Sequence, residues 1–184
     1  MNMLIAITGA SGISLTIKLL AKLREKKIYT ELIISNNAEK LIEIETDYKL
    51  EDIHKLADKI YDVNDLTAKP ASGSYIIKDM VIIPCTMKTL AAIANGYADN
   101  LITRAADVMI KERRKLILVV RESPFSAIHL ENMLKLAKLG VIIAPPIPSY
   151  YIKPKSVNDL NEYFIGRILD HLEIESNIKR WGNG

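Results

Sequence analysis

The chain has 184 residues, enough for one domain with one core, and its 49 % hydrophobic and 26 % charged residues are typical of a folded globular protein. The formal net charge of +3 is too small to indicate a nucleic-acid-binding protein, which would need a concentrated basic face. There is one cysteine, Cys85, and no apolar run long enough to cross a bilayer, so we expect no internal disulfide, no membrane association and a cytoplasmic location.

Five short apolar segments predict buried β-strands. In chain order they are residues 3–7, 31–34, 80–83, 116–120 and 140–143. Their hydrophobicity is continuous rather than alternating, which is the pattern of a parallel sheet covered by helices on both faces.

Amphipathic segments between and after these strands predict helices. The helix after the first strand carries an apolar face made of Ile13, Ile17, Leu20 and Leu23, and a helix over residues 100–113 turns inward Leu101, Ala105, Val108 and Met109. A last helix is expected to begin at Ser156, where Asp159 completes a partial capping box. This alternation predicts an α/β fold: a Rossmann-like, doubly wound parallel sheet in three layers, formed by a single domain over residues 1–184.

Ligands of open α/β sheets bind beyond the carboxyl ends of the strands. The segments that follow the five predicted strands are Thr8–Gly12, Ser35–Asn37, Pro84–Thr89, Arg121–Pro124 and Ala144–Pro148. Four of these five carry hydroxyl or charged side chains suited to a phosphorylated ligand. Their convergence predicts a phosphate-bearing ligand at this edge of the sheet.

The turn at residues 9–12 leaves two interpretations open. Its glycines let the backbone approach a phosphate at a helix amino terminus, where Ser11 adds a hydroxyl. The alternative is a plain strand-to-helix turn with Ser11 as N-cap. The turn has neither a dinucleotide-binding glycine pattern nor a Walker A lysine, so NAD and ATP are not indicated. The phosphate interpretation gains because Ser35 and Thr86 to Thr89 are expected at the same edge.

Several charged side chains have a ligand-binding and a structural interpretation. Arg104 and Lys111 lie seven residues apart, on one helical face, and their spacing by itself favours a solvated stripe over a ligand site. Arg167 falls close to the apolar side of the last helix, and there and at Arg121 a guanidinium needs either a carboxylate or a ligand phosphate. Glu122, at a strand end, could transfer protons or form a structural salt bridge with an arginine.

The potential metal ligands do not form a recognisable site. The three histidines, His54, His129 and His171, and Cys85 lack metal-ligand spacing, and no paired-aspartate motif is present for magnesium. We expect no metal, so that lysine and arginine side chains would neutralise any phosphate directly.

Together these segments resemble the UbiX flavin prenyltransferase family. The resemblance runs in order over nearly the whole chain. It is carried by residues 9–12, 72–74, 84–90, 99–108, 111–114, 121–124, 129–130 and 148–151, with the most specific block between Pro84 and Pro124.

The resemblance implies a reaction and its partners. Family members bind FMN and attach a dimethylallyl group from dimethylallyl phosphate to N5 and C6 of the reduced flavin. The product is handed to UbiD-type decarboxylases. The members are homo-oligomers, usually dodecamers, with active sites between subunits, which implies a subunit interface at the C-terminal helix and tail from about residue 156.

The resemblance also implies site residues. The FMN-binding set is Gly9, Ala10, Ser11, Ser35, Thr86, Met87, Lys88, Thr89 and Arg121. The donor phosphate would be bound by Arg104, Lys111, Tyr151 and Arg167. The residues implied in catalysis are Glu122, Ser11 and Trp181, whose aromatic face could stabilise an allylic cation.

The chain departs from the family pattern at three places. Residues 12–16 lack the usual Tyr-Gly pair, Thr86 replaces the commoner serine but keeps the hydroxyl, and Lys153 stands where arginine is frequent. Two alternative functions remain open: an FMN-dependent cysteine decarboxylase of the same fold, and a non-catalytic flavin carrier. The donor could be the monophosphate or the diphosphate, and the absence of a magnesium motif favours the monophosphate.

Overall fold

A six-stranded parallel β-sheet forms the centre of the first of two compact units in the computed structural model, which describes residues 2–182. The first unit is Met1–Pro145 and the second is Pro146–Gly184. Whether they act as the single domain expected from the sequence stays a prediction, and each unit is described by itself.

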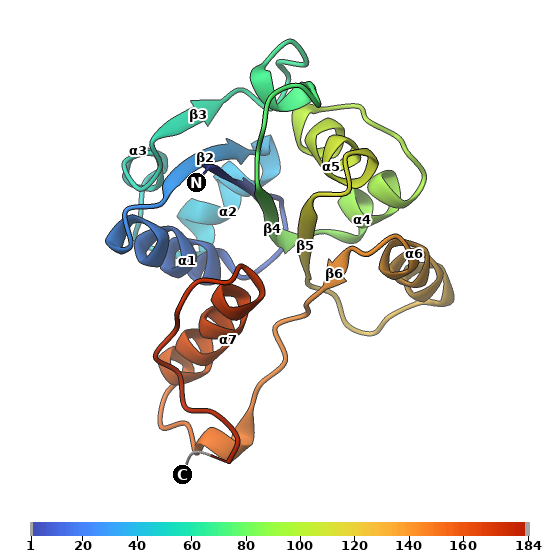
Figure 1. Cartoon of the computed structure of the whole chain (residues 1–184). Coiled ribbons are helices and arrows are strands. Elements are labelled where there is room, and N and C mark those ends of the chain that lie inside the picture. The colour runs from blue at the N-terminus through green and yellow to red at the C-terminus, as the bar shows by residue number, and fades with distance from the viewer. Residues whose placement is uncertain (1, 183–184) are drawn as a thin grey trace. The chain divides into compact units, whose positions relative to one another are not determined.

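The order of the strands places a crossover at the centre of the sheet (Figure 1). From edge to edge the strands are β3 (Lys59–Tyr61), β2 (Tyr29–Ile34), β1 (Asn2–Ile7), β4 (Asp79–Cys85), β5 (Lys115–Val120) and β6 (Ile142–Ile143), all parallel. This is the strand order of a doubly wound, Rossmann-like sheet, whose topological switch point lies between β1 and β4.

All five predicted strands are present, and the structure adds a sixth. The sequence analysis missed β3 because it has only three residues, and Lys59 and Ile60 are exposed at the sheet edge. Such a strand has no apolar run and is defined by its pairing with β2, where Lys59 lies opposite Glu31.

Helices cover both faces of the sheet, which confirms the three-layer fold. The helices of the first unit are α1 (Ile13–Glu25), α2 (Asn36–Glu45), α3 (Leu50–His54), α4 (Met87–Ala94), α5 (Leu101–Lys111) and α6 (Ala127–Lys138), with a 3₁₀ turn, η1 (Lys69–Ala71). Side chains of α4, α5 and α6 pack with Leu4, Met80 and Leu118 in one apolar core. Right-handed crossovers put α1 on the opposite face.

The predicted buried faces of two helices are largely confirmed. Leu101, Ala105, Val108 and Met109 of α5 are all buried. In α1, Ile13, Leu20 and Leu23 are buried, but Ile17 is only half-buried, while Leu15, Thr16 and Leu19 are buried instead. The apolar stripe of α1 is therefore wider than its spacing predicted.

The second unit contains a 3₁₀ turn, η2 (Tyr150–Ile152), and helix α7 (Val157–His171). The predicted cap is confirmed: Ser156 Oγ accepts from Asp159 N at 3.2 Å and Asp159 Oδ2 accepts from Ser156 N at 3.0 Å. The helix buries Ile165, Gly166, Ile168 and Leu169. The expectation that Arg167 lies close to the apolar side is wrong, because this residue points away from the buried face and its side chain is 45 % exposed.

A buried carboxylate stabilises the amino-terminal edge of the sheet. Glu31 of β2 is fully buried, and the hydroxyl of Tyr75 donates to its Oε1 at 2.6 Å. Asn2 Nδ2 in turn donates to the Tyr75 hydroxyl at 3.1 Å. Burial and the neighbouring Glu31 carboxylate raise the pKa of Tyr61 well above its ordinary value. This network holds the connection from β3 to β4 against the sheet.

We predict that Tyr75→Phe lowers the free energy of unfolding by about 1–3 kcal/mol, because it removes a hydrogen-bond donor from a buried carboxylate. Tyr97→Phe is the matched control, since Tyr97 is 64 % exposed. Urea unfolding of both variants measures the difference, and equal stabilities would contradict a structural role for the network.

Candidate functional site

A cleft of about 410 Å³ opens at the switch point, beyond the carboxyl ends of β1, β2 and β4. Its walls come from the segments that follow these strands and from the start of α5. The lining residues are Thr8, Gly9, Ser35, Asn36, Asn37, Val63, Asn64, Thr86, Lys88, Thr89, Asp99, Asn100 and Ile102. The position is the one at which doubly wound sheets bind their ligands.

Thr8 connects the two central strands at the floor of this cleft. Its hydroxyl donates to the Pro84 carbonyl at 2.8 Å and accepts from Thr86 N at 2.9 Å. The backbone N–H of Thr8 also donates to the Pro84 carbonyl, at 3.2 Å. These bonds fix the start of α4 relative to the end of β1.

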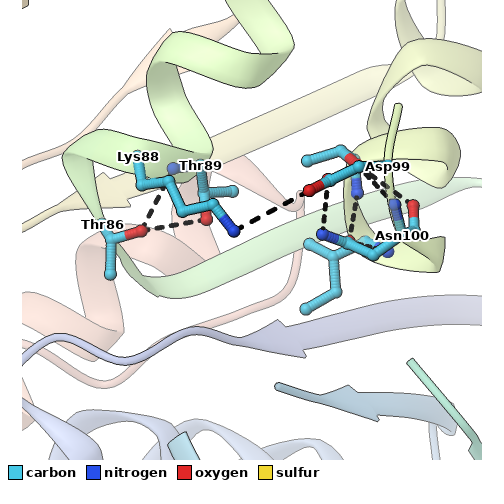
Figure 2. A network of polar contacts seen from close by, with 7 residues as sticks. Thr86, Lys88, Thr89, Asp99 and Asn100 are labelled. Carbon is cyan, nitrogen blue, oxygen red and sulfur yellow. Dashed lines mark hydrogen bonds and ion pairs between the residues drawn. The ribbon is translucent and has the colours of Figure 1, made fainter. Parts of the chain in front are cut away.

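The amino terminus of α4 presents two hydroxyls to the cleft (Figure 2). Thr86 is the N-cap: its Oγ1 accepts from Thr89 N at 3.1 Å and lies 2.9 Å from Thr89 Oγ1. Lys88 Nζ reaches Asp99 Oδ2 at 3.8 Å, and Asp99 Oδ1 accepts from Asn100 Nδ2 at 2.8 Å. A helix amino terminus with hydroxyls and a nearby ammonium group is suited to an anion.

The second wall is the start of α2, where Ser35 is the N-cap and accepts from Ala38 N at 3.3 Å. Gly9 approaches this helix so closely that an added Cβ would lie 2.6 Å from Asn37 Cβ. Only glycine fits at this position without a shift of α2. The close approach seen here is to Asn37 of α2, so the predicted role of Gly9 toward a phosphate stays a prediction.

The amino terminus of α1 already has an acceptor from the protein. The N-cap is Gly12, with φ of 119°, and not Ser11. Glu45 Oε2 accepts from Gly12 N at 2.9 Å and from Ile13 N at 3.0 Å. The phosphate expected at residues 9–12 would compete with this carboxylate, so the α4 and α2 ends are the better phosphate site.

Glu45 was not among the sequence candidates. Burial by itself would raise the pKa of its carboxyl, but hydrogen bonds from Gly12, Ser11 and Ile13 and the charge of Arg121 lower the pKa below its ordinary value. Glu45 thus stays ionised at the start of α1, next to two residues predicted to act in the site. No motif marked it, because it reaches this position from the far end of α2.

Arg104 and Lys111 lie along one side of α5, against the loop over residues 71–74. Arg104 Nε donates to the Ala71 carbonyl at 3.0 Å, and its NH1 to Asp107 Oδ2 at 2.7 Å. Lys111 pairs with Glu112, and both flank Gly73 so closely that an added Cβ would meet their side chains. Neither cation lines the cleft described above.

Arg121 and Glu122 follow β5 and are both exposed. The backbone N–H of Arg121 donates to the Cys85 carbonyl at 3.1 Å, which holds the end of β5 beside that of β4. Glu122 Oε1 accepts from Ser123 N at 3.0 Å. Among residues 2–182, Glu122 forms no ion pair within 4.0 Å, so the structural salt bridge considered for it is not observed.

The second unit gathers three of the sequence candidates in one place. Tyr151 packs edge-to-face on Trp181, with ring centroids 5.2 Å apart, and on Tyr163 at 5.7 Å, and the two tyrosine hydroxyls are hydrogen-bonded. The hydrogen bond with Tyr163 raises the pKa of Tyr151, and the positive charge of the nearby Arg167 opposes this rise. A pocket of about 370 Å³ beside these rings is lined by Tyr151, Lys179, Arg180, Trp181 and Gly182.

Comparison with known proteins identifies the family to which this chain belongs. Residues 1–169 match the family model described as Flavoprotein. The chain is 50 % identical over 183 residues to the flavin prenyltransferase UbiX of Methanocaldococcus jannaschii, and the alignment covers 99 % of each protein. The chain belongs to the UbiX-like flavin prenyltransferase family. The resemblance stated from sequence motifs is therefore confirmed.

Solved structures of UbiX-like proteins have the same fold. A crystal structure of AnUbiX in complex with FMN and dimethylallyl pyrophosphate superposes with a TM-score of 0.97 at 46 % identity, covering 98 % of this chain and 97 % of that one. A dodecameric FMN-dependent UbiX-like decarboxylase from Escherichia coli O157:H7 gives 0.95 at 45 % identity, covering 98 % and 99 %. The UbiX-like chain is accordingly an FMN-binding flavoprotein.

The structure divides the sequence candidates of this UbiX-like chain into groups. Gly9, Ser35, Thr86, Lys88 and Thr89 line the cleft. Ala10, Ser11, Met87, Arg121 and Glu122 belong to the segments around it but do not line it. Tyr151 and Trp181 line the pocket of the second unit, and Arg167 lies near Tyr151.

Several cleft residues were missed by the sequence analysis. Asn36, Asn37 and Asn64 line the cleft, as do Asp99 and Asn100. Asp99 and Asn100 belong to the family motif over residues 99–108, but no role was assigned to them. Asn100 reaches the cleft because it is the N-cap of α5. In the described part of the chain no cluster of three or more potential metal ligands is found, and no helix is long and apolar enough to span a membrane.

We predict that Glu45→Ala lowers the free energy of unfolding by about 1 kcal/mol near pH 7, because it removes the acceptor of two helix amides. The Glu45 pKa is lowered by folding, so this contribution is present above its ordinary value of 4.5 and is lost as pH falls through the folded pKa. The difference from wild type should therefore shrink near pH 3.

Chemical denaturation at pH 7 and at pH 3 measures this effect. Glu43→Ala, an exposed residue on the same helix, is the matched control. A Glu45→Ala difference that is equal at both pH values would show that the ionised carboxylate is not what stabilises the start of α1.

Proposed function

We propose that this chain transfers a dimethylallyl group from dimethylallyl phosphate to N5 and C6 of reduced FMN. The observation that carries the proposal is the cleft at the switch point, where hydroxyls and amides at the starts of α4 and α2 can bind the phosphate of the flavin. Arg104, Lys111 and the arginine–tyrosine cluster of the second unit provide separate groups for a second anion. A protein that only carried flavin would need no second anion site.

The residues at the cleft fit the phosphate of FMN. Thr86 and Thr89 offer hydroxyls, and Lys88 offers a positive charge at the same helix end. Gly9 lets the start of α2 approach the end of β1 closely, which sets the width of the cleft on this side. We place Ala10, Ser11, Met87 and Arg121 around the flavin as well. Reduced FMN, as the acceptor substrate, supplies the two nucleophilic ring positions.

The donor phosphate is assigned to Arg104, Lys111, Tyr151 and Arg167. When the C–O bond of the donor breaks, inorganic phosphate leaves with the electron pair, and cationic side chains stabilise the charge that develops on it. The flavin gains one C5H8 unit in total, and no oxidant or reductant is consumed. In this scheme Glu122 transfers a proton, and Ser11 lies near N5 of the acceptor flavin. Trp181 presents the face of its ring to the allylic group.

The product is proposed to serve a UbiD-type decarboxylase. We also propose a cytoplasmic location, which the single cysteine supports, since Cys85 is a buried thiol. The donor is proposed to be the monophosphate, and both donors enter the test below.

The chain is proposed to form a homo-oligomer through α6. Ile128, Leu130, Leu134 and Leu139, on and just beyond this helix, are each at least 53 % exposed, and only Leu136 of α6 is buried. Leu130 and Leu134, four residues apart, lie on one side of α6, and an exposed apolar pair of this kind indicates an interaction surface. The dodecameric state of a UbiX-like relative supports a second copy of this chain as the occupant.

We predict that anaerobic incubation with reduced FMN and dimethylallyl phosphate yields a released flavin heavier by one C5H8 unit, as measured by mass spectrometry. Glu122→Gln should retain FMN but lower turnover by about 100-fold, because it removes an acid–base group. Glu51→Gln, on the exposed side of α3, is the matched control.

Unchanged flavin with the monophosphate but product with the diphosphate would correct the donor. Bound FMN unchanged with both donors would contradict the prenyltransferase activity and favour a flavin carrier. A Glu122→Gln variant with wild-type turnover would leave the reaction intact and remove Glu122 from it.

We predict that Leu134→Glu shifts the chain toward smaller species, because it buries a charge in the proposed α6 contact. Light scattering coupled to size-exclusion chromatography measures the mass. Leu66→Glu, at an exposed position outside α6, should leave it unchanged. An unchanged mass for Leu134→Glu would exclude this face as the contact.

A further inference from the structure

Asp170, near the end of α7, is the centre of a hydrogen-bond network in the second unit. Arg180 binds it with two parallel bonds, NH1 to Oδ2 and NH2 to Oδ1, each at 2.8 Å. Arg167 NH1 donates to Oδ2 at 2.8 Å, and Ser176 Oγ donates to Oδ1 at 2.7 Å. The carboxylate is only 17 % exposed, so both oxygens are used in a mostly desolvated position.

Two features bring the C-terminal segment back to Asp170. The chain turns at Glu173, where φ is +60°, and then runs back along α7 (Figure 1). Further along, Ile178 packs directly on Gly166, where an added Cβ would lie 2.1 Å from Ile178 Cγ2. The segment over residues 173–182, which we term the return segment, is therefore attached to α7 by an apolar contact and by the Arg180–Asp170 pair.

The position of Trp181 follows from this attachment. Trp181 is the neighbour of Arg180 in the chain, and its ring lies 5.2 Å from that of Tyr151. Trp181 is 80 % exposed, so burial contributes little to its placement. A bidentate pair on the adjacent residue supplies the orientation that burial does not.

We propose that Asp170 is a positioning residue that orients Arg167 and, through Arg180, holds Trp181 against Tyr151. The proposal rests on the proposed function in that Arg167, Tyr151 and Trp181 are the groups assigned to the prenyl donor. One carboxylate between two arginines leaves one net positive charge and fixes both guanidinium groups. Arg167 has five N–H donors and uses one of them on Asp170, so the others stay available to a phosphate.

The experiment uses the only tryptophan of the chain as its reporter. In the purified full chain, Asp170→Asn should lower the fluorescence anisotropy of Trp181 and reduce energy transfer from tyrosine, because the return segment is released. Gly166→Ala should do the same without changing charge, since it displaces Ile178. The control is Glu175→Gln, which removes one negative charge, as Asp170→Asn does, but from the return segment itself. It should leave the anisotropy and the energy transfer unchanged.

A second measurement separates positioning from simple attachment. Asp170→Asn should raise KM for dimethylallyl phosphate by about tenfold, the equivalent of about 1.4 kcal/mol, while FMN affinity stays at the wild-type value. Arg180→Lys keeps the charge but loses the bidentate geometry, so it should lower the anisotropy with a smaller rise in KM.

Each outcome decides the proposal. Wild-type anisotropy in Asp170→Asn would overturn it, and lowered anisotropy with unchanged KM would overturn the link to the donor. If Asp170→Asn does not fold, Ser176→Ala and Arg180→Lys give the same two measurements. If the wild-type chain shows no prenyl transfer, the affinity for inorganic phosphate replaces KM, so failure of the proposed function is seen separately from failure of the network.

Discussion

The hydroxyl of Thr8 links the ends of the two central strands, and the geometry of the cleft depends on this link. It donates to the Pro84 carbonyl and accepts from the Thr86 amide, so the start of α4 is fixed to the end of β1. Because β1 and β4 are neighbours at the point where the strand order reverses, the helices that follow them diverge to opposite faces. The cleft opens at this point and is lined by the starts of α2, α4 and α5, whose N-caps are Ser35, Thr86 and Asn100.

The helix amino termini of α1, α2 and α4 have different acceptors. Glu45 occupies the amides of α1, whereas α2 and α4 are capped by the shorter side chains of Ser35 and Thr86. A carboxylate acceptor repels a ligand anion and a hydroxyl does not, which is why we propose the starts of α4 and α2 as the phosphate site. The proposed donor-binding arginines, Arg104 and Arg167, each pair with an aspartate three residues further along the chain. The Arg104–Asp107 pair is partly exposed on both sides, and such a pair is weak enough to be exchanged for a phosphate, whereas Asp170 is only 17 % exposed and holds Arg167 in place.

Continuous apolar runs, turn residues and family motifs were sufficient to predict the parallel sheet, five of its strands and the part of the cleft that follows β1, β2 and β4. These signals are local, since a buried strand or a capped helix is encoded by a few consecutive residues. Lys59–Tyr61 was missed because an edge strand is defined by its partner, and Arg167 was placed too close to the apolar face because helical spacing alone does not fix the rotation of a helix.

The sequence by itself determined the fold class, the family and the residues that follow each strand. The tertiary structure decided which of these residues share a cleft, which helix end is already filled by Glu45, and that Asp170 joins Arg167 to the residue beside Trp181. The physical reason is the range of the interactions: groups 33 residues apart, such as the backbone N–H of Gly12 and the carboxylate of Glu45, meet only after the sheet has brought their helices together.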